Sequence, residues 1–354
     1  MQTSNIPALP AFVGAPDMNR VYQCDALTLL RALPDASVDL VLTDPPYNVG
    51  KASWDTWPTN SAFIEWLDGI LAEYRRVLKP NGSLYLFCAT ALGARVEMTT
   101  ANYFNVLTNI RWRKQEGWHQ KARPEDLRAF FPASETCILA EQYAASDSYT
   151  FADYELNGKV YEPLKAWFRS RARVAGITNQ QFNVALGFAS NGGGVASGVI
   201  GEKVEFAMPT SDVYARMQAA FPDIFDREYE DLRREYEDLR REYEDLRRPF
   251  NATPERPYTD VWHYKTVNTY PNKHICEKPL DMMRDIVRIS SRPDALVLDT
   301  FAGSGNSLRA ARELGRRWLG CDTDRTWVER ANRRITAPIY TQFTLFEAQQ
   351  QGAD

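Results

Sequence analysis

The sequence predicts an α/β protein with a parallel sheet, interrupted by a mostly helical insertion. Buried-type strands alternate with amphipathic helices over residues 20–143 and again over 276–336, and this alternation is typical of parallel α/β sheets. Between the two blocks the alternation stops, and a length of 354 residues accommodates two domains. The expected organisation is a loose N-terminus at 1–19, two halves of a sheet domain at 20–150 and 258–344, an insertion at 151–257, and a loose C-terminus at 345–354.

The first block contains two strands joined by a helix. Residues 37–43 form a short apolar strand pattern, and the two prolines that follow cannot donate to a strand ladder. Residues 63–77 carry apolar side chains at helical spacing, and Lys-Pro-Asn-Gly at 79–82 predicts a turn. Residues 83–88 then form a second apolar strand. This order of elements predicts a parallel sheet.

The insertion begins with a helical segment at 176–221. Thr178 and Gln181 have the spacing of a helix capping box. A glycine-rich turn follows the first helix, then a short segment at 195–204 and a third helix at 211–221. This order resembles the phage-repressor type of helix-turn-helix. Two interpretations stay open, a DNA contact and a small structural insert.

Residues 227–248 form a heptad repeat. Arg-Glu-Tyr-Glu-Asp-Leu-Arg occurs three times with period seven, which places the tyrosines and leucines on one stripe of a helix. The stripe either packs on its own domain or pairs with a second copy of the chain in a homodimer. DNA contact is disfavoured, because the segment holds 7 basic and 9 acidic residues.

The second block continues the α/β pattern. Residues 279–290 predict a helix, and 295–299 predict a strand that leads directly into a turn containing two glycines. A helix at 308–314 and a strand at 317–322 follow.

Composition excludes several classes of protein. No apolar run reaches the roughly 18 residues that cross a bilayer, and the first residues lack the basic and apolar regions of a secretory signal. Five cysteines, never in a Cys-x-x-Cys pair, and three histidines disfavour a disulfide framework and a metal site. We therefore expect a cytoplasmic protein that binds no metal.

The turn after the first strand carries groups suited to an exocyclic amine. Ligands of open α/β folds bind at the carboxyl ends of strands, where this turn lies. The amine of a planar base is a poor nucleophile, because its lone pair is conjugated with the ring. A carboxylate and a rigidly held carbonyl can accept its two N–H bonds and expose the lone pair, and a tyrosine ring can stack on the base. The candidate catalytic residues are Asp44, Pro45, Pro46 and Tyr47.

The turn at 299–305 is a candidate nucleoside site. Its glycines, Gly303 and Gly305, allow the backbone to approach a ligand at a helix N-terminus. The full dinucleotide pattern GxGxxG is absent, so a nucleoside without a pyrophosphate fits better. Asp322 ends the next strand and is placed for ribose hydroxyls. S-adenosylmethionine is such a ligand, and a purely structural turn is the alternative.

Taken together, these motifs resemble the DNA amino-methyltransferases in the permuted order called the β class. In that class the catalytic motif comes first, target recognition lies in the middle, and the cofactor motif is near the C-terminus. The resemblance covers most of 20–150 and 258–336. Further matching segments, in order, are Cys24-Asp25-Ala26, residues 33–40, residues 76–82 and the His-x-x-x-Lys-Pro element at 274–279.

The resemblance implies a Rossmann-like class I methyltransferase sheet of seven strands, one of them antiparallel. It implies methyl transfer from S-adenosylmethionine to adenine N6 in double-stranded DNA, with the base flipped out. Direct displacement from sulfur to nitrogen needs neither a covalent enzyme intermediate nor a metal. By this resemblance Asp25 contacts the adenine amine of the cofactor, Asp322 its ribose, and Lys278 with Pro279 its methionine side. The full set of implied cofactor residues is Asp25, Ala26, Asp44, Lys278, Pro279, Asp299, Phe301, Gly303, Ser304, Gly305 and Asp322.

Parts of the middle region resemble a phage and prophage subgroup. These are residues 130–135, the helix-turn-helix-like insert, the heptad repeat and residues 257–262. Some members of that subgroup methylate adenine with little or no sequence preference. The resemblance therefore implies relaxed specificity and protection of phage or mobile DNA from restriction. It also implies a location in the bacterial cytoplasm, or in the host cytoplasm if the protein is encoded by a phage.

Residues 111–123 interleave cations with aromatic rings, a composition that suits phosphate contact and base stacking. The alternative is a solvated loop whose rings join the core. The candidate DNA-contacting residues are Arg111, Arg113, Lys114, Trp118, His119, Lys121 and Arg123.

Competing functions remain to be separated. Cytosine N4 is an alternative target, although cytosine enzymes of the family more often begin the catalytic motif with Ser. Enzymes that methylate protein amides typically begin it with Asn and keep the cofactor motif upstream; RNA is a further substrate class. A DNA-binding regulator with a degenerate methyltransferase body is the non-enzymatic alternative, and the intact Asp44, Tyr47, Asp299, Gly303 and Gly305 argue against it.

Overall fold

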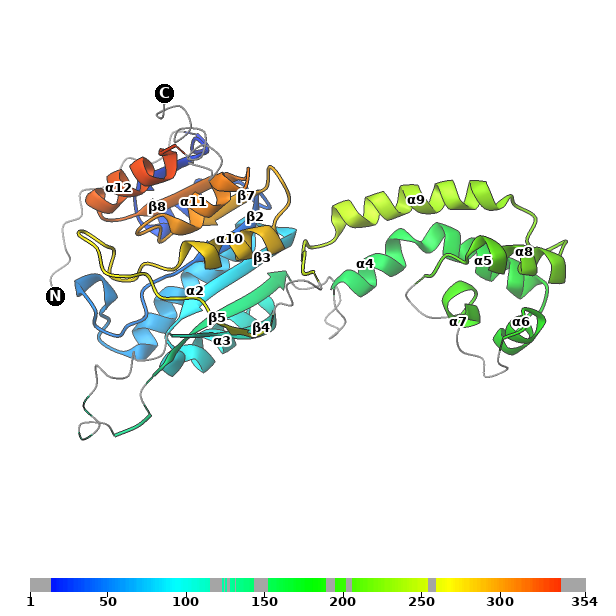
Figure 1. The fold of residues 1–354 in the computed structure, drawn as a ribbon, viewed down its shortest axis with the longest axis horizontal. Helices are drawn as coiled ribbons and strands as arrows, with labels where there is room; N and C mark the ends of the chain where they lie inside the picture. The colour runs from blue at the N-terminus through cyan, green and yellow to red at the C-terminus, as the bar shows by residue number, and fades with distance from the viewer. Residues whose placement is uncertain are drawn as a thin grey trace, which may run out of the picture. The chain divides into compact units, whose positions relative to one another are not determined.

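The computed structural model divides into two compact units, residues 1–142 with 249–354 (the sheet unit) and residues 143–248 (the helical unit) (Figure 1). The helical unit begins and ends earlier in the chain than the predicted insertion of 151–257. The described residues are 14–114, 123, 125, 128–130, 132–142, 152–188, 195–201, 206–253 and 259–338.

The described residues of the sheet unit form eight strands in the order β1-β8-β7-β2-β3-β5-β4-β6. β5 runs antiparallel to both of its neighbours, and all other neighbours are parallel. The predicted sheet with one antiparallel strand is confirmed; the additional eighth strand, β6, is a two-residue pairing at the edge. The strands are β1 (Arg20–Gln23), β2 (Val38–Thr43), β3 (Leu78–Cys88), β4 (Phe104–Arg113), β5 (Ser134–Gln142), β6 (Val261–Trp262), β7 (Leu296–Asp299) and β8 (Arg317–Asp322).

Helices cover both faces of the sheet. Leu40 and Leu42 of β2 join one buried cluster and Val41 joins another, because successive side chains of a strand point to opposite faces. The Val41 cluster packs against α1 (Ala26–Arg31), α2 (Asn60–Val77) and α3 (Gly93–Ala101). The Leu40 cluster packs against α10 (Leu280–Ser290), α11 (Asn306–Glu313) and α12 (Arg325–Thr336). This unit also contains the short 3-10 helices Ser53–Asp55 and Thr90–Leu92.

The predicted turn at 79–82 is wrong, because these residues lie inside β3. Val38 pairs with Leu78, whereas Leu40 pairs with Ser83, so the register shifts between the two pairs. The proline, asparagine and glycine are accommodated in this irregularity of the ladder, where a proline without an N–H is tolerated.

The helical unit consists of short helices around a core of its own. The capping box predicted from Thr178 and Gln181 is present at the start of α6, and the three helices predicted within 176–221 correspond to α6, α7 and α8. The helices of this unit are α4 (Ala152–Val160), α5 (Glu162–Val174), α6 (Asn179–Ala185), α7 (Val195–Val199), α8 (Ser211–Ala220) and α9 (Tyr229–Leu246).

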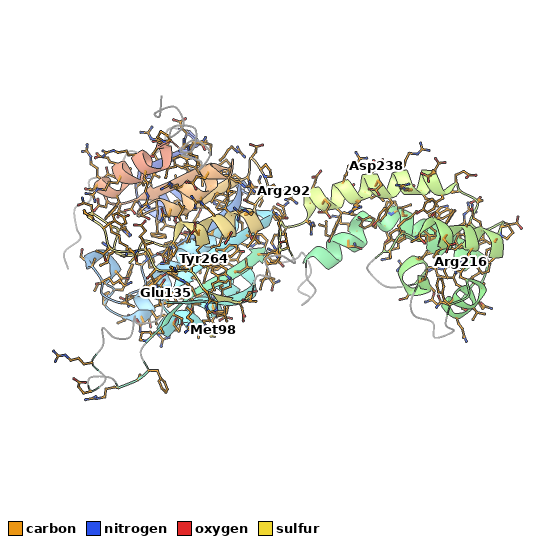
Figure 2. All side chains as sticks on the ribbon, viewed as in Figure 1. Met98, Glu135, Arg216, Asp238, Tyr264 and Arg292 are labelled. Carbon is orange, nitrogen blue, oxygen red and sulfur yellow. The ribbon has the colours of Figure 1, made fainter. Side chains whose placement is uncertain are left out.

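The heptad repeat forms α9, an 18-residue helix. Leu232 is fully buried, and the ring of Tyr236 stacks on Tyr161 of the same unit with centroids 5.3 Å apart. The stripe therefore packs on its own domain. Charged residues such as Asp238 occupy the opposite face, where Asp238 pairs with Arg241 (Figure 2). Pairing with a second copy of the chain stays a prediction.

Candidate active site

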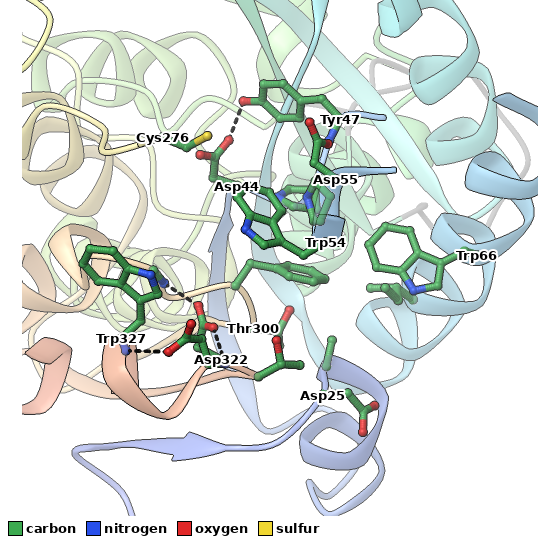
Figure 3. A pocket seen from close by; sticks show the side chains of 18 of the residues that line it. Asp25, Asp44, Tyr47, Trp54, Asp55, Trp66, Cys276, Thr300, Asp322 and Trp327 are labelled. Carbon is green, nitrogen blue, oxygen red and sulfur yellow. Dashed lines mark hydrogen bonds between the residues drawn. The ribbon is translucent and has the colours of Figure 1, made fainter. Parts of the chain in front are cut away.

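Three neighbouring parallel strands bring the predicted motifs together. β2 ends at the Asp-Pro-Pro-Tyr motif, β7 ends at Asp299 before the glycine turn, and β8 ends at Asp322. Because the carboxyl ends of parallel strands meet at one edge, the motifs share one cavity of about 290 Å³ (Figure 3). Predicted residues in its lining are Asp25, Ala26, Asp44, Pro45, Pro46, Tyr47, Phe301, Gly303 and Asp322.

Asp44 is held by two partners. The hydroxyl of Tyr47 donates to one carboxylate oxygen (Figure 3), and Nζ of Lys278 lies 2.5 Å from the other. Burial and the neighbouring Asp44 raise the pKa of Tyr47 well above its usual value. The tyrosine therefore stays a neutral phenol that donates to the carboxylate.

Lys278 lines a second, smaller cavity beside Asp44 and also contacts the candidate catalytic motif. Its Nζ lies 3.1 Å from the hydroxyl of Tyr47 and 3.2 Å from Oε2 of Glu135, in addition to the contact with Asp44. Burial lowers the pKa of Lys278, but the two carboxylates outweigh burial and raise it. A buried ammonium requires such partners, so Lys278 is held by these contacts, and its role on the methionine side of the cofactor stays a prediction. Pro279 is the residue before α10.

Asp55 organises the loop that follows the catalytic motif. Its buried carboxylate accepts backbone N–H groups of Tyr47 at 2.6 Å, Asn48 at 2.8 Å, Val49 at 3.3 Å and Lys51 at 3.1 Å. These four hydrogen bonds fix the course of the loop around one side chain. Sequence reasoning does not identify Asp55, because its partners are backbone groups.

The glycine turn is fixed by a buried carboxylate. Asp299 accepts the N–H of Phe301 at 3.0 Å and the hydroxyl of Thr43 at 3.1 Å. Burial raises the pKa of Asp299 to about 6. Gly303 has φ +47°, and a Cβ there would lie 3.0 Å from the ring of His274, so both backbone and space require glycine.

Two further acidic residues border the cavity. Asp322 accepts the N–H of Gly303 at 2.9 Å, and burial raises its pKa. Asp25 caps α1 by accepting the N–H of Thr28 at 3.0 Å. Both carboxylates lie on the cavity wall away from Asp44, as a nucleoside bound along the wall requires (Figure 3).

The lining of the two cavities fits a nucleoside that carries an ammonium group. The carboxylates of Asp25 and Asp322 can accept from the nucleoside, and the oxygen of Asn306 can accept from the ammonium. Aromatic rings line much of the larger cavity, those of Tyr47, Trp54, Trp57, Trp66, His274, Phe301 and Trp327. A smaller cavity of about 40 Å³ is lined by Asp44, Ser304 and Asn306, among others.

The amide of Asn306 in this smaller cavity has an unused acceptor. Its Nδ2 donates to Oε1 of Glu277 at 3.0 Å and to the carbonyl of Lys278 at 2.7 Å. Both partners are acceptors, so they fix the orientation of the amide and leave its buried oxygen without a partner. A buried unpaired acceptor is costly, which points to a ligand donor. Among the described residues no cluster could hold a metal ion.

The predicted DNA-contacting residues do not form one group. Lys114 lies 2.5 Å from Oε1 of Glu135 and 3.8 Å from the ring centre of Trp112, and its side chain is mostly buried. Arg111 donates to Thr136 at 2.6 Å. Arg113 and Arg123 are exposed, whereas Trp118, His119 and Lys121 lie outside the described residues.

The fold is that of the class I DNA methyltransferases. It aligns with the PvuII cytosine-N4-specific DNA methyltransferase at a TM-score of 0.50 and 13% identity, covering 94% of this chain and 92% of that one. More narrowly, the family model of the N6/N4 DNA methylases matches residues 38–333, and the chain belongs to this family of DNA methylases.

Curated relatives are similar over most of their length. The Type II methyltransferase M1.MboII of Moraxella bovis is 25% identical over 329 residues, 89% of this chain and 96% of the relative. The DNA adenine methyltransferase YhdJ of Escherichia coli K12 is 24% identical over 324 residues, 88% of this chain and 80% of the relative.

Proposed function

We propose that the protein transfers a methyl group from S-adenosylmethionine to the N6 amine of adenine in double-stranded DNA. The observation that carries the proposal is the carboxylate of Asp44, which borders a nucleoside-sized cavity and is held by Tyr47 and Lys278. Membership of the DNA methylase family supports the DNA substrate.

The cavity supports S-adenosylmethionine as methyl donor. The nucleoside would lie along the wall that holds Phe301, Gly303 and Asp322, with Asp25 and Ala26 at its far end. The smaller cavity, where Asn306 has its unpaired oxygen, would take the ammonium of the methionine part. When bound, this molecule supplies an electrophilic methyl group on a sulfonium.

The catalytic motif would activate the amine. The carboxylate of Asp44 and the carbonyl of Pro45 accept its two N–H bonds, so the nitrogen lone pair is directed at the methyl carbon. The carbon–sulfur bond breaks as the carbon–nitrogen bond forms, and the positive charge moves to the nitrogen. Asp44 then accepts the surplus proton. The base reaches the motif by leaving the DNA stack.

Adenine is favoured over cytosine by the first residue of the motif, Asp44, and by YhdJ, a relative named as an adenine methyltransferase. Cytosine N4 is the second candidate, because both amines present the same geometry to the motif. The resemblance to the phage and prophage subgroup supports relaxed sequence specificity and protection of mobile DNA in the cytoplasm. Among the described residues no helix is long and apolar enough to cross a membrane.

Nucleoside mass spectrometry tests this function. Unmethylated DNA is incubated with the pure protein and S-adenosylmethionine, beside an Asp44→Ala control and a calorimetric measurement of cofactor binding. N6-methyladenine with the native protein only, and cofactor binding by both proteins, is the expected result. N4-methylcytosine would overturn the base assignment, and no methylated nucleoside from DNA would overturn the enzymatic function. Methylation at many unrelated sites would support relaxed specificity.

A further inference from the structure

A row of alternating charges lies behind the catalytic carboxylate. Nζ of Lys278 lies 2.5 Å from Asp44 and 3.2 Å from Oε2 of Glu135, and Oε1 of Glu135 lies 2.5 Å from Nζ of Lys114. Each of these side chains is at most 17% exposed. Glu135 is the second residue of β5, the antiparallel strand (Figure 2).

Glu135 is ionised in this setting. Burial raises the pKa of Glu135, but the ammonium groups of Lys278 and Lys114 outweigh burial and lower the pKa to about 2. The carboxylate therefore carries a full negative charge at neutral pH, and it lies 3.5 Å from the hydroxyl of Tyr47.

The charges of the four groups cancel only when Glu135 is present. Without it, the two ammonium groups and the carboxylate of Asp44 would sum to +1. The proposed reaction brings a positive charge onto the amine beside Asp44, and charges in a site that excludes water interact strongly. An additional positive charge there would oppose the transfer.

Glu135 also shares Lys278 with Asp44. With Asp44 as its single carboxylate partner, the ammonium of Lys278 could change position around that one contact. Because Lys278 lies between Asp44 and Glu135, the two carboxylates together fix its position. The contact between Lys278 and Asp44 in turn fixes the carboxylate that receives the amine.

We propose that Glu135 is a positioning residue of the methyl-transfer site, which holds Lys278 between two carboxylates and keeps the site free of net positive charge. The inference rests on the proposed function. Glu135 acts through Lys278 and does not accept the amine itself.

The experiment compares kcat and KM of full-length variants in a radioactive methyl-transfer assay with unmethylated DNA. Glu135→Gln removes the charge and keeps the shape, and Lys114→Met with Glu135→Gln removes both outer charges. Glu141→Gln is the matched control, because Glu141 is a buried carboxylate on the same strand, 3.2 Å from Asn105. Thermal unfolding and calorimetric binding of S-adenosylmethionine are measured for each protein.

We expect Glu135→Gln to lower kcat on the order of 10- to 100-fold, with unchanged KM for S-adenosylmethionine and a melting temperature like that of Glu141→Gln. The double variant should recover part of kcat, because it restores zero net charge. A Glu135→Gln kcat equal to the native value would overturn the inference. A loss of kcat that parallels a loss of melting temperature, and that the double variant does not relieve, would also overturn it.

If the single variant does not fold, a native kcat in the double variant overturns the inference and a lowered kcat supports it. A native protein that methylates no nucleic acid would instead overturn the proposed function, and the inference with it.

Discussion

Asp44 and Lys278 are 234 positions apart in the sequence, yet a carboxylate oxygen of one lies 2.5 Å from Nζ of the other. Asp44 follows β2 in the first half of the chain, and Lys278 precedes α10 in the second half. This contact therefore forms only when both halves of the sheet unit have folded together.

Replacing Lys278 with Met should destabilise the sheet unit strongly. The substitution leaves the carboxylates of Asp44 and Glu135 without their shared cation, and breaking a buried pair costs about 3–5 kcal/mol. Lys79→Met is the control, because Lys79 pairs with Asp39 at 2.7 Å but is 34% exposed, and exposed pairs contribute at most about 1 kcal/mol. Urea unfolding followed by tryptophan fluorescence measures both variants, and equal losses would contradict the prediction.

Replacing Gly303 with Ala should weaken cofactor binding on the order of 10-fold and cost about 1–2 kcal/mol of stability. Its φ of +47° is unfavourable for alanine, and the new methyl group would press against His274. Gly69→Ala is the opposite case, since nothing lies within 4 Å of the added methyl in the interior of α2. That control should raise stability by about 0.5–1 kcal/mol. Thermal melting and calorimetry measure these effects; unchanged binding in Gly303→Ala would count against the assigned cofactor turn.

Asp299 should make stability depend on pH. Its folded pKa of about 6 lies above the ordinary value of 3.8, so the folded state favours the protonated form. That stabilisation is complete below about pH 4 and is lost as the pH rises through about 6, a change of roughly 3 kcal/mol. Urea unfolding of the native protein and of Asp299→Asn, from about pH 4 to about pH 7.5, should show the native protein losing stability relative to the variant. Parallel profiles would contradict this expectation.

Replacing a leucine with alanine should have different effects on stability at the two ends of α9. Leu232→Ala removes a fully buried side chain and should cost about 2–5 kcal/mol. Leu246→Ala changes a side chain that is 47% exposed, so its effect should stay within about 0.5 kcal/mol. Amide hydrogen exchange of α9 reports the local stability in each variant. Similar protection losses in both would show that the stripe does not pack on its own unit.

Local patterns predict the elements that local physics determines. The strand at 317–322 coincides with β8, and the capping box at Thr178 is formed as expected, because side-chain alternation and capping depend on near neighbours. The turn predicted at 79–82 is wrong because pairing with β2 continues the strand through a proline and a glycine. Tertiary pairing outweighs local preference there.

The candidate site is predictable only in part for the same reason. The Asp-Pro-Pro-Tyr motif and the glycine turn follow strands whose order places them at one edge. The partners of Lys278, and the four N–H groups on Asp55, arise from contacts that no sequence spacing encodes. Lys114 illustrates the limit, since a basic residue in a basic segment turns out to pair with Glu135 on the neighbouring strand.

The separate core of the helical unit has an evolutionary consequence. The described residues of that core all belong to the unit itself, so a substitution among them is accommodated within the helical unit. Each copy of the heptad adds about 10 Å and almost two full turns of helix, which keeps the tyrosines and leucines on the same face. Gain or loss of one copy would therefore change the length of α9 in fixed increments. Selection could act on this length while the sequence of the sheet unit stays constant.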